Sequence, residues 1–206
     1  MEQRKIRGEA ISAPVVGRYA VISPGATNPR RMWPIARFAE IGRAVYQRYG
    51  LRTIVIGGPA DIGCCEALSN AIGESALSMA GKTDSLQILD IIAAAEIFLG
   101  NDSGPAHIAG GLGIFTVVIS PFPSSCTVDH PNSPTRFRPA GNRVQVLQPV
   151  APVEPCSPMC QHDKAHCILQ VSSDQVLASI SAEVNANRVS AGEKMRDKSV
   201  CGDPTL

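Results

Sequence analysis

The stretch that decides the fold is Glu96-Ile-Phe-Leu-Gly-Asn-Asp-Ser-Gly-Pro-Ala-His107-Ile-Ala109. A short apolar run is followed by polar residues and a proline, and an apolar helical pattern then begins. This order predicts a buried strand, a tight turn and the start of a helix. Ligands of open α/β sheets bind beyond the carboxyl ends of the strands, and free N–H groups at a helix start attract anions. The turn therefore places Asp102, Ser103 and His107 where such a sheet holds its ligand.

Composition limits the class of protein. The chain has 206 residues, 44% of them apolar and 18% charged, which indicates one globular domain with a substantial core. The net charge of +1 argues against a nucleic-acid groove and a polybasic membrane anchor. No apolar stretch approaches the ~20 residues that cross a bilayer, and no secretion signal is recognised near the amino end. Seven cysteines without framework spacing then favour reduced thiols, and we expect a cytoplasmic protein.

Strands and helices alternate along the rest of the chain. Apolar, largely β-branched runs predict strands at 19–23, 53–56, 97–99 and 115–119, and shorter strands are expected at 76–79 and 144–147. Helical patterns lie between most of them, and a final helix is expected from about 172. Alternation of this kind predicts a parallel sheet with helices on both faces, an α/β fold of the Rossmann type. We expect a lead-in over 1–18, the domain over 19–185, and a disordered tail over 186–206.

The loop after the first strand is the second candidate site. It reads Ser23-Pro-Gly-Ala-Thr-Asn-Pro-Arg-Arg-Met-Trp-Pro34. Its glycine lets the backbone turn closely, Thr27 and Asn28 offer polar side chains, and Arg30 and Arg31 bring positive charge suited to a diphosphate. It matches neither a G-x-G-x-x-G fingerprint nor a phosphate-binding Walker loop. An ordinary solvated loop is the alternative.

Three further features each allow two interpretations. Asp61 follows the second strand, where an acid often binds a ribose hydroxyl, but it also suits a helix cap. Asp102 and Ser103 could serve as a helix cap, and His107 could pack within the first turn of its helix. Asp-Ser-Gly is not a protease nucleophile here, because it lies between a parallel-type strand and a helix.

A late cysteine-rich segment contains four possible soft metal ligands, Cys156, Cys160, His166 and Cys167. Their spacing lacks the paired C-x2-C units of common zinc sites. We therefore expect buried thiols or an occasional disulfide and no bound metal. Cys64 and Cys65 are expected to pack inside a helix.

Taken in order, these segments resemble the family 9 glycosyltransferases, the ADP-heptose:lipopolysaccharide heptosyltransferases. The matching motifs are Pro24-Gly25-Ala26, Arg31-Met32-Trp33-Pro34, Gly57-Gly58, Gly81-Lys82-Thr83-Asp84-Ser85-Leu86, Asn101 to His107, and Pro155 to Cys167. The resemblance covers residues 19 to about 181. Each motif alone is weak, whereas the ordered set is fairly specific.

The resemblance implies a role for each site residue. This chain is similar to the second, donor-binding domain of a GT-B enzyme, which has two Rossmann-type domains facing a cleft. By position, Thr27 and Arg31 would hold the diphosphate, Asp61 would lie near the ribose, and Lys82 and Thr83 would line the adenine. The resemblance further implies that Asp102, Ser103 and Gly104 face the sugar and its phosphates, with His107 supporting that turn or the phosphate.

The implied reaction transfers heptose from ADP-heptose to the lipopolysaccharide inner core with inversion, without a metal or other cofactor. The family's first domain, which carries the acceptor site and the expected catalytic base, has no counterpart before Tyr19. We therefore expect a donor-binding half that is inactive alone, with a partner chain for the first domain and a place in the cytoplasm or at the inner membrane. A non-catalytic nucleotide-sugar-binding module or a degenerate paralogue is the alternative, and an NAD-dependent epimerase ranks last because it would need G-x-G-x-x-G.

Overall fold

The computed structural model describes residues 17–126, 133–154, 156 and 163–198, with side chains of the last helix described as far as residue 186. Its centre is a six-stranded parallel sheet in the order β3-β2-β1-β4-β5-β6. The strands are β1 (Tyr19–Ser23), β2 (Arg52–Val55), β3 (Ala76–Ser78), β4 (Ile97–Asn101), β5 (Phe115–Ile119) and β6 (Val144–Leu147). This is the strand order of the Rossmann fold, as the alternating pattern predicted.

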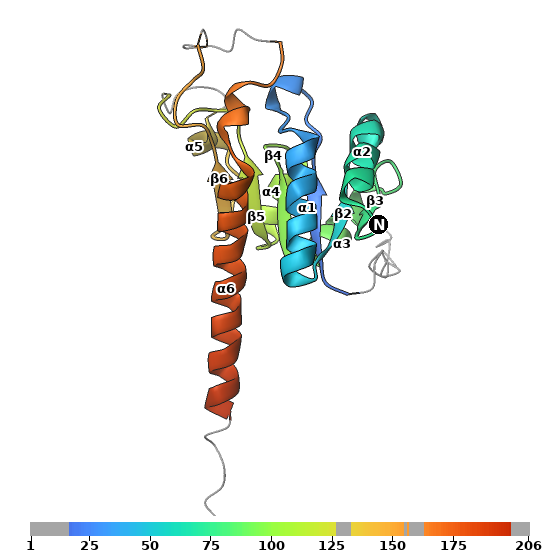
Figure 1. Cartoon of the computed structure of the whole chain (residues 1–206), viewed down its shortest axis with the longest axis vertical. Helices are drawn as coiled ribbons and strands as arrows, with labels where there is room; N and C mark the ends of the chain where they lie inside the picture. Colours follow the sequence, from blue (N-terminus) through green and yellow to red (C-terminus); the bar gives the residue numbers. More distant parts are fainter. Residues whose placement is uncertain (1–16, 127–132, 155, 157–162, 199–206) are drawn as a thin grey trace, which may run out of the picture.

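Helices cover both faces of the sheet (Figure 1). They are α1 (Ile35–Tyr49), α2 (Ile62–Ile72), α3 (Ser85–Ala93), α4 (Gly104–Gly111), α5 (Pro134–Phe137) and α6 (Ser173–Lys198). Three 3₁₀ turns, η1 (Pro29–Arg31), η2 (Pro59–Asp61) and η3 (Cys167–Gln170), interrupt the connections. The short helix α5 lies in the proline-rich segment between β5 and β6, for which the sequence predicted no helix.

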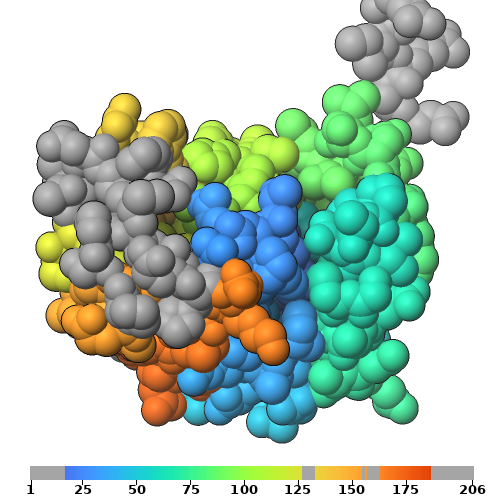
Figure 2. All heavy atoms as spheres, turned by 90° about the horizontal axis from the view of Figure 1, so that it is seen from above, coloured from blue at the N-terminus to red at the C-terminus, as the bar shows by residue number. Residues whose placement is uncertain are grey.

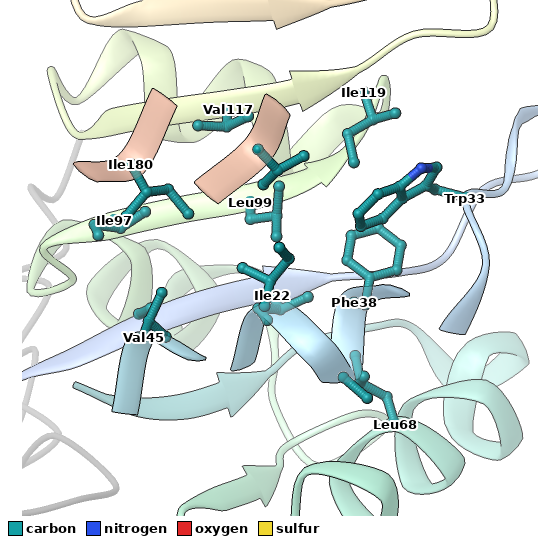
Figure 3. Close-up of a cluster of buried hydrophobic side chains, with 14 of the residues drawn as sticks. Ile22, Trp33, Phe38, Val45, Leu68, Ile97, Leu99, Val117, Ile119 and Ile180 are labelled. Atoms are coloured by element: carbon teal, nitrogen blue, oxygen red, sulfur yellow. The ribbon is translucent and has the colours of Figure 1, made fainter. Parts of the chain in front are cut away.

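Successive side chains along each strand point to opposite faces of the sheet and so contribute to two separate hydrophobic cores. On one face, Ile22, Leu99 and Val117 pack with residues of α1, α2 and α6 (Figure 3). On the other face, Val21 and Phe98 pack with residues of α3 and α4. The central strands are buried on both sides, which explains why their sequences read as continuous apolar runs rather than as alternation.

Local sequence signals mark the ends of the helices. Gly50 ends α1 in the left-handed conformation, with φ at 69°, and the Gly50 N–H donates to the Tyr46 carbonyl. Asp84 and Gln87 form a capping box at the start of α3, each side chain accepting from the other's backbone N–H. Pro34 precedes the first residue of α1 rather than opening its first turn.

The last helix is longer than the sequence predicted. We expected a disordered tail from residue 186, but α6 continues to Lys198. Figure 1 shows its far end running past the sheet. Polar composition predicted disorder here, whereas this stretch has no proline and its one glycine is tolerable inside a helix. Residues 1–16 of the predicted lead-in lie outside the described residues, as do residues 199–206 of the tail.

Candidate functional site

The candidate site lies where the chain changes faces. β1 is hydrogen-bonded to β2 on one side and to β4 on the other. After β1 the chain enters α1 on one face, and after β4 it enters α4 on the other. Such a divergence is the switch point at which open α/β sheets bind ligands. Figure 2 looks onto this edge, where the loop after β1, in blue, lies between yellow-green residues following β4 and teal residues following β2.

Arg31 and Asp102 meet across this switch point. The Arg31 NH2 group donates to Asp102 Oδ2 at 2.6 Å, joining the loop after β1 to the turn after β4. The Asp102 side chain is only 12% exposed, so solvent screens the pair less than it would at an open surface. Arg31 Nε is buried without a hydrogen-bond partner among the described residues. The arginine therefore retains a donor for an oxygen that the described residues do not supply.

Asn101, the last residue of β4, fixes the loop that carries Arg31. Its side chain is fully buried. The Asn101 Oδ1 atom accepts from the Trp33 N–H at 3.0 Å, and its Nδ2 donates to the Pro24 carbonyl at 2.6 Å. One amide thus holds both ends of the loop. Sequence reasoning placed Asn101 in a motif but gave it no role.

The turn after β4 leaves the start of α4 open. Ser103 stands at the N-cap position, yet its hydroxyl makes no cap and donates instead to the Asn101 carbonyl at 3.1 Å. The interpretation of Ser103 as a simple cap is therefore wrong. Gly104 is exposed and opens the helix. His107 is exposed rather than packed within the first turn, and its ring has no hydrogen bond to any described residue.

Asp61 faces the first loop, and its side chain caps the 3₁₀ turn η2 rather than the helix α2. Its Oδ2 accepts from the Gly58 N–H at 3.0 Å, and it makes no side-chain cap on α2. A Cβ at Gly25 would lie 2.4 Å from Asp61 Oδ1, so glycine is required for the two loops to approach this closely. Asp61 and the loop of Thr27 are thus brought together. Thr27 itself is exposed, with no hydrogen bond to the described residues.

Lys82 and Thr83 lie at the same edge of the sheet, after β3. Lys82 Nζ donates to the Ser78 carbonyl at 3.0 Å, and the Thr83 hydroxyl to the Met79 carbonyl at 3.5 Å. A backbone bond from Gly81 to Gly57 joins this loop to the one after β2. No described contact joins either side chain to Arg31 or Asp102. The two residues therefore share the edge with the ion pair but do not form a cluster with it.

Cys64 and Cys65 adjoin Asp61 at the start of α2, where the Cys64 thiol donates to the Asp61 carbonyl at 3.1 Å. Burial raises the pKa of the Cys65 thiol and, less strongly, that of Cys64, which fits helix packing rather than reactivity. In the late segment, Cys156 Sγ lies 2.9 Å from His166 Nε2, and the buried Cys167 accepts from the Val153 N–H. Cys160 lies outside the described residues. Within the described residues no group of three potential ligands could hold a metal ion.

The fold and this edge define a Rossmann-type α/β domain whose polar loops converge at the switch point. The chain belongs to glycosyltransferase family 9 (heptosyltransferase), whose family model matches residues 2–164. Lipopolysaccharide heptosyltransferase 3 of Escherichia coli K12 is 31% identical over 122 residues, which are 58% of this chain and 35% of that protein. The chain thus aligns with about a third of this curated relative's length.

Solved structures share the fold. The ADP-heptose LPS heptosyltransferase II of E. coli superposes with a TM-score of 0.67 at 21% identity, covering 83% of this chain and 47% of that chain. The dodecameric iron-containing heptosyltransferase TibC, from enterotoxigenic E. coli and solved in complex with ADP-D-beta-D-heptose, gives a TM-score of 0.58 at 18% identity. It covers 85% of this chain and 48% of that chain. The chain thus spans about half the length of both structures.

Proposed function

We propose that this chain binds the ADP-sugar donor of a heptosyl transfer reaction, with the diphosphate at the edge formed by the loops after β1 and β4. The observation that carries the proposal is the Arg31–Asp102 contact across the switch point, with Arg31 Nε buried and unpaired among the described residues. A planar guanidinium suits phosphate oxygens because it can donate two parallel hydrogen bonds. The relatives named above for ADP-heptose and for lipopolysaccharide supply the substrate class.

Each site residue then has a proposed part. Thr27 and Arg31 bind the diphosphate, together with the backbone N–H of the exposed Gly104 at the start of α4. Asp102, Ser103 and Gly104 face the sugar, and His107 supports the phosphate. Asp61 lies toward the ribose, although Gly58 already occupies its Oδ2 atom. Lys82 and Thr83 line the adenine from the loop after β3.

In the proposed reaction an acceptor hydroxyl oxygen attacks the anomeric carbon of the heptose. The bond from that carbon to the β-phosphate oxygen breaks, the electron pair leaves with ADP, and a base takes the hydroxyl proton. Attack opposite the leaving group inverts the anomeric centre. Arg31 and the α4 N-terminus would stabilise the negative charge that develops on the departing phosphate.

We propose that this donor domain needs no metal or other cofactor, because Arg31 supplies the positive charge beside the leaving group. The iron named for TibC raises the question of a metal site in this chain. Among the described residues no group of three potential metal ligands is found, and Cys160 lies outside them. No step of the proposed reaction passes through a metal.

We further propose that the acceptor site and the base lie in a first domain outside this chain, as in a GT-B enzyme. The chain's coverage of about half of each solved relative supports this division. The acceptor would be a lipopolysaccharide core sugar, and the reaction would take place in the cytoplasm or at the inner membrane. None of the described helices is long and apolar enough to cross a membrane.

A non-catalytic nucleotide-sugar-binding module is the second candidate, and it shares the same donor site. The two candidates differ in turnover when a first domain is supplied, not in donor binding. Donor binding is therefore the first property to measure.

Calorimetric titration with ADP and ADP-heptose tests the site. The wild-type chain should bind both ligands, and Arg31→Ala should weaken ADP binding by about tenfold to a hundredfold, because hydrogen bonds to charged groups contribute about 1.5–3 kcal/mol. Arg30→Ala is the matched control, since Arg30 is adjacent but lies 3.4 Å from the exposed Asp163. Equal binding by both variants would refute the assignment of Arg31.

A further inference from the structure

The buried amide of Asn101 is the best-defined polar group near the site to which the proposed reaction gives no part. We propose that Asn101 is a positioning residue, which sets Arg31 in place for the diphosphate by holding both ends of the loop 24–33. This inference rests on the proposed donor binding, because the affinity for ADP is the property that Asn101 would control. Asn101 does not itself contact the ligand in this account.

Asn101 joins two groups of opposite polarity. The Trp33 N–H needs an acceptor and the Pro24 carbonyl needs a donor, and the side-chain amide supplies both from one buried position. An aspartate would offer two acceptors when ionised, and a leucine would offer neither. Because the side chain is fully buried, water does not readily replace either bond.

The loop between these two ends is stiff near Arg31. Asn28 Oδ1 accepts from the Arg30 N–H at 3.0 Å, and the Arg31 N–H donates to the Asn28 carbonyl at 2.9 Å. Arg31 lies two residues before Trp33, so a shift at the Trp33 clamp is transmitted along a short, hydrogen-bonded segment. The guanidinium would then move relative to Asp102, which follows Asn101 directly in the turn after β4.

Trp33 is also anchored from the opposite side. Its indole Nε1 donates to the Val171 carbonyl at 2.8 Å, and the same carbonyl accepts from Arg37 at 2.7 Å. The Trp33 ring packs edge-on against Phe38 in the core. Loss of the Asn101 bonds is therefore expected to release the loop and not the whole indole, so the fold can survive the substitution.

The test compares Asn101→Leu with a matched control in a buried strand. Thr116→Val removes a fully buried hydroxyl on β5 that donates to the carbonyl of Ile114 just before the strand, with no described contact to the loop. We expect Asn101→Leu to weaken ADP binding by about tenfold or more, because removing one charge-assisted hydrogen bond to the ligand corresponds to such a factor. Thr116→Val should keep ADP affinity within about twofold of wild type, even if its melting temperature falls as much as that of Asn101→Leu.

A double variant separates positioning from general destabilisation. If Asn101 acts through Arg31, Asn101→Leu should have little further effect on ADP affinity in a chain that already carries Arg31→Ala. Additive losses would overturn the inference. Wild-type ADP affinity in a folded Asn101→Leu variant would overturn it as well. If Asn101→Leu does not fold, Asn101→Asp replaces it in the same comparison, because it retains the acceptor for Trp33 and removes only the donor to Pro24.

Hydrogen exchange of the ligand-free protein distinguishes this inference from donor binding itself. The backbone amides of residues 25–33 should exchange faster in Asn101→Leu than in wild type and Thr116→Val. Unchanged exchange there would refute the clamp whatever the chain binds. If the wild-type chain binds no ADP while Asn101→Leu still shows the faster exchange, the proposed function is refuted and Asn101 remains the clamp of this loop alone.

Discussion

Arg31 and Arg30 are neighbours in sequence, yet the structure gives them different surroundings. Arg31 contacts Asp102, whose side chain is 12% exposed, whereas Arg30 lies near Asp163, whose side chain is 99% exposed. Ion pairs at an open surface contribute little, and a partly buried charge is screened less by solvent. The two arginines are thus chemically separable, although the sequence alone presents them as one basic pair.

Asp102→Asn should change the affinity for ADP and the affinity for ADP-heptose to different extents. Removing the carboxylate frees Arg31 and lowers repulsion with the diphosphate, so ADP should bind about threefold to tenfold more tightly, given that such an ion pair is worth about 1 kcal/mol. The preference for ADP-heptose over ADP should fall, because the variant lacks the carboxylate that is proposed to bind the sugar. Calorimetry on both ligands measures this ratio, with Asp163→Asn as the control. An unchanged ratio would argue that Asp102 does not face the sugar.

Gly25→Ala should disturb the contact between the loops after β1 and β2. The new Cβ would lie 2.4 Å from Asp61 Oδ1, so one of the loops must move. We expect a stability loss of about 1–3 kcal/mol, the range for overpacked sites, and weaker ADP binding. Gly63→Ala in α2 is the control, because its Cβ would meet nothing within 4 Å. Chemical denaturation measures the difference, and equal stability of the two variants would contradict the steric argument.

At this scale, the sequence indicated residue types better than it indicated contacts. Arg31 and Asp102 were predicted at one ligand site, and they meet because parallel strands end at the same edge of a sheet. The role of Asn101 was not predictable, since its partners are backbone groups far away in the sequence. Asp61 and Ser103 were ambiguous for a similar reason, because capping residues and ligand-binding residues have the same side chains.

Among the elements, the start of α3 is the clearest case in which sequence determines local structure. Asp84→Ala should cost about 1 kcal/mol, because it removes the acceptor for the Gln87 N–H. Asp90→Ala, near the other end of the same helix, should change the free energy of unfolding by less than about 0.5 kcal/mol. Urea denaturation of both variants tests this. Equal losses would contradict a specific contribution of the Asp84 cap.

The elements themselves were largely predictable, and their ends less so. Periodicity predicted all six strands, because the four inner strands are largely apolar and almost fully buried and the edge strands β3 and β6 are short runs with apolar residues. It did not predict the short α5, which falls in a proline-rich segment, or the length of α6. The polar residues beyond 186 have no core-facing apolar pattern. A prediction based on amphipathicity alone therefore placed the end of the helix too early.

At the scale of the whole molecule, the account predicts that this chain binds the donor and that another domain supplies the acceptor site and the base. The chain aligns with about half of each solved relative, and we propose that acceptor binding and the base lie elsewhere. With ADP-heptose and a lipopolysaccharide core acceptor, this chain alone should therefore show little transfer. Adding a first domain from a family 9 relative should raise the rate, as followed by ADP release. An ordinary enzymatic rate from this chain alone would contradict the division.

The most direct test of the central claim is hydrogen exchange of the wild-type chain with and without ADP-heptose, because it locates the ligand without any substitution. The account predicts that the donor slows exchange mainly in two segments, residues 24–33 after β1 and residues 101–107 after β4. Protection confined to other parts of the chain, or no protection at saturating ADP-heptose, would contradict a donor site at this switch point.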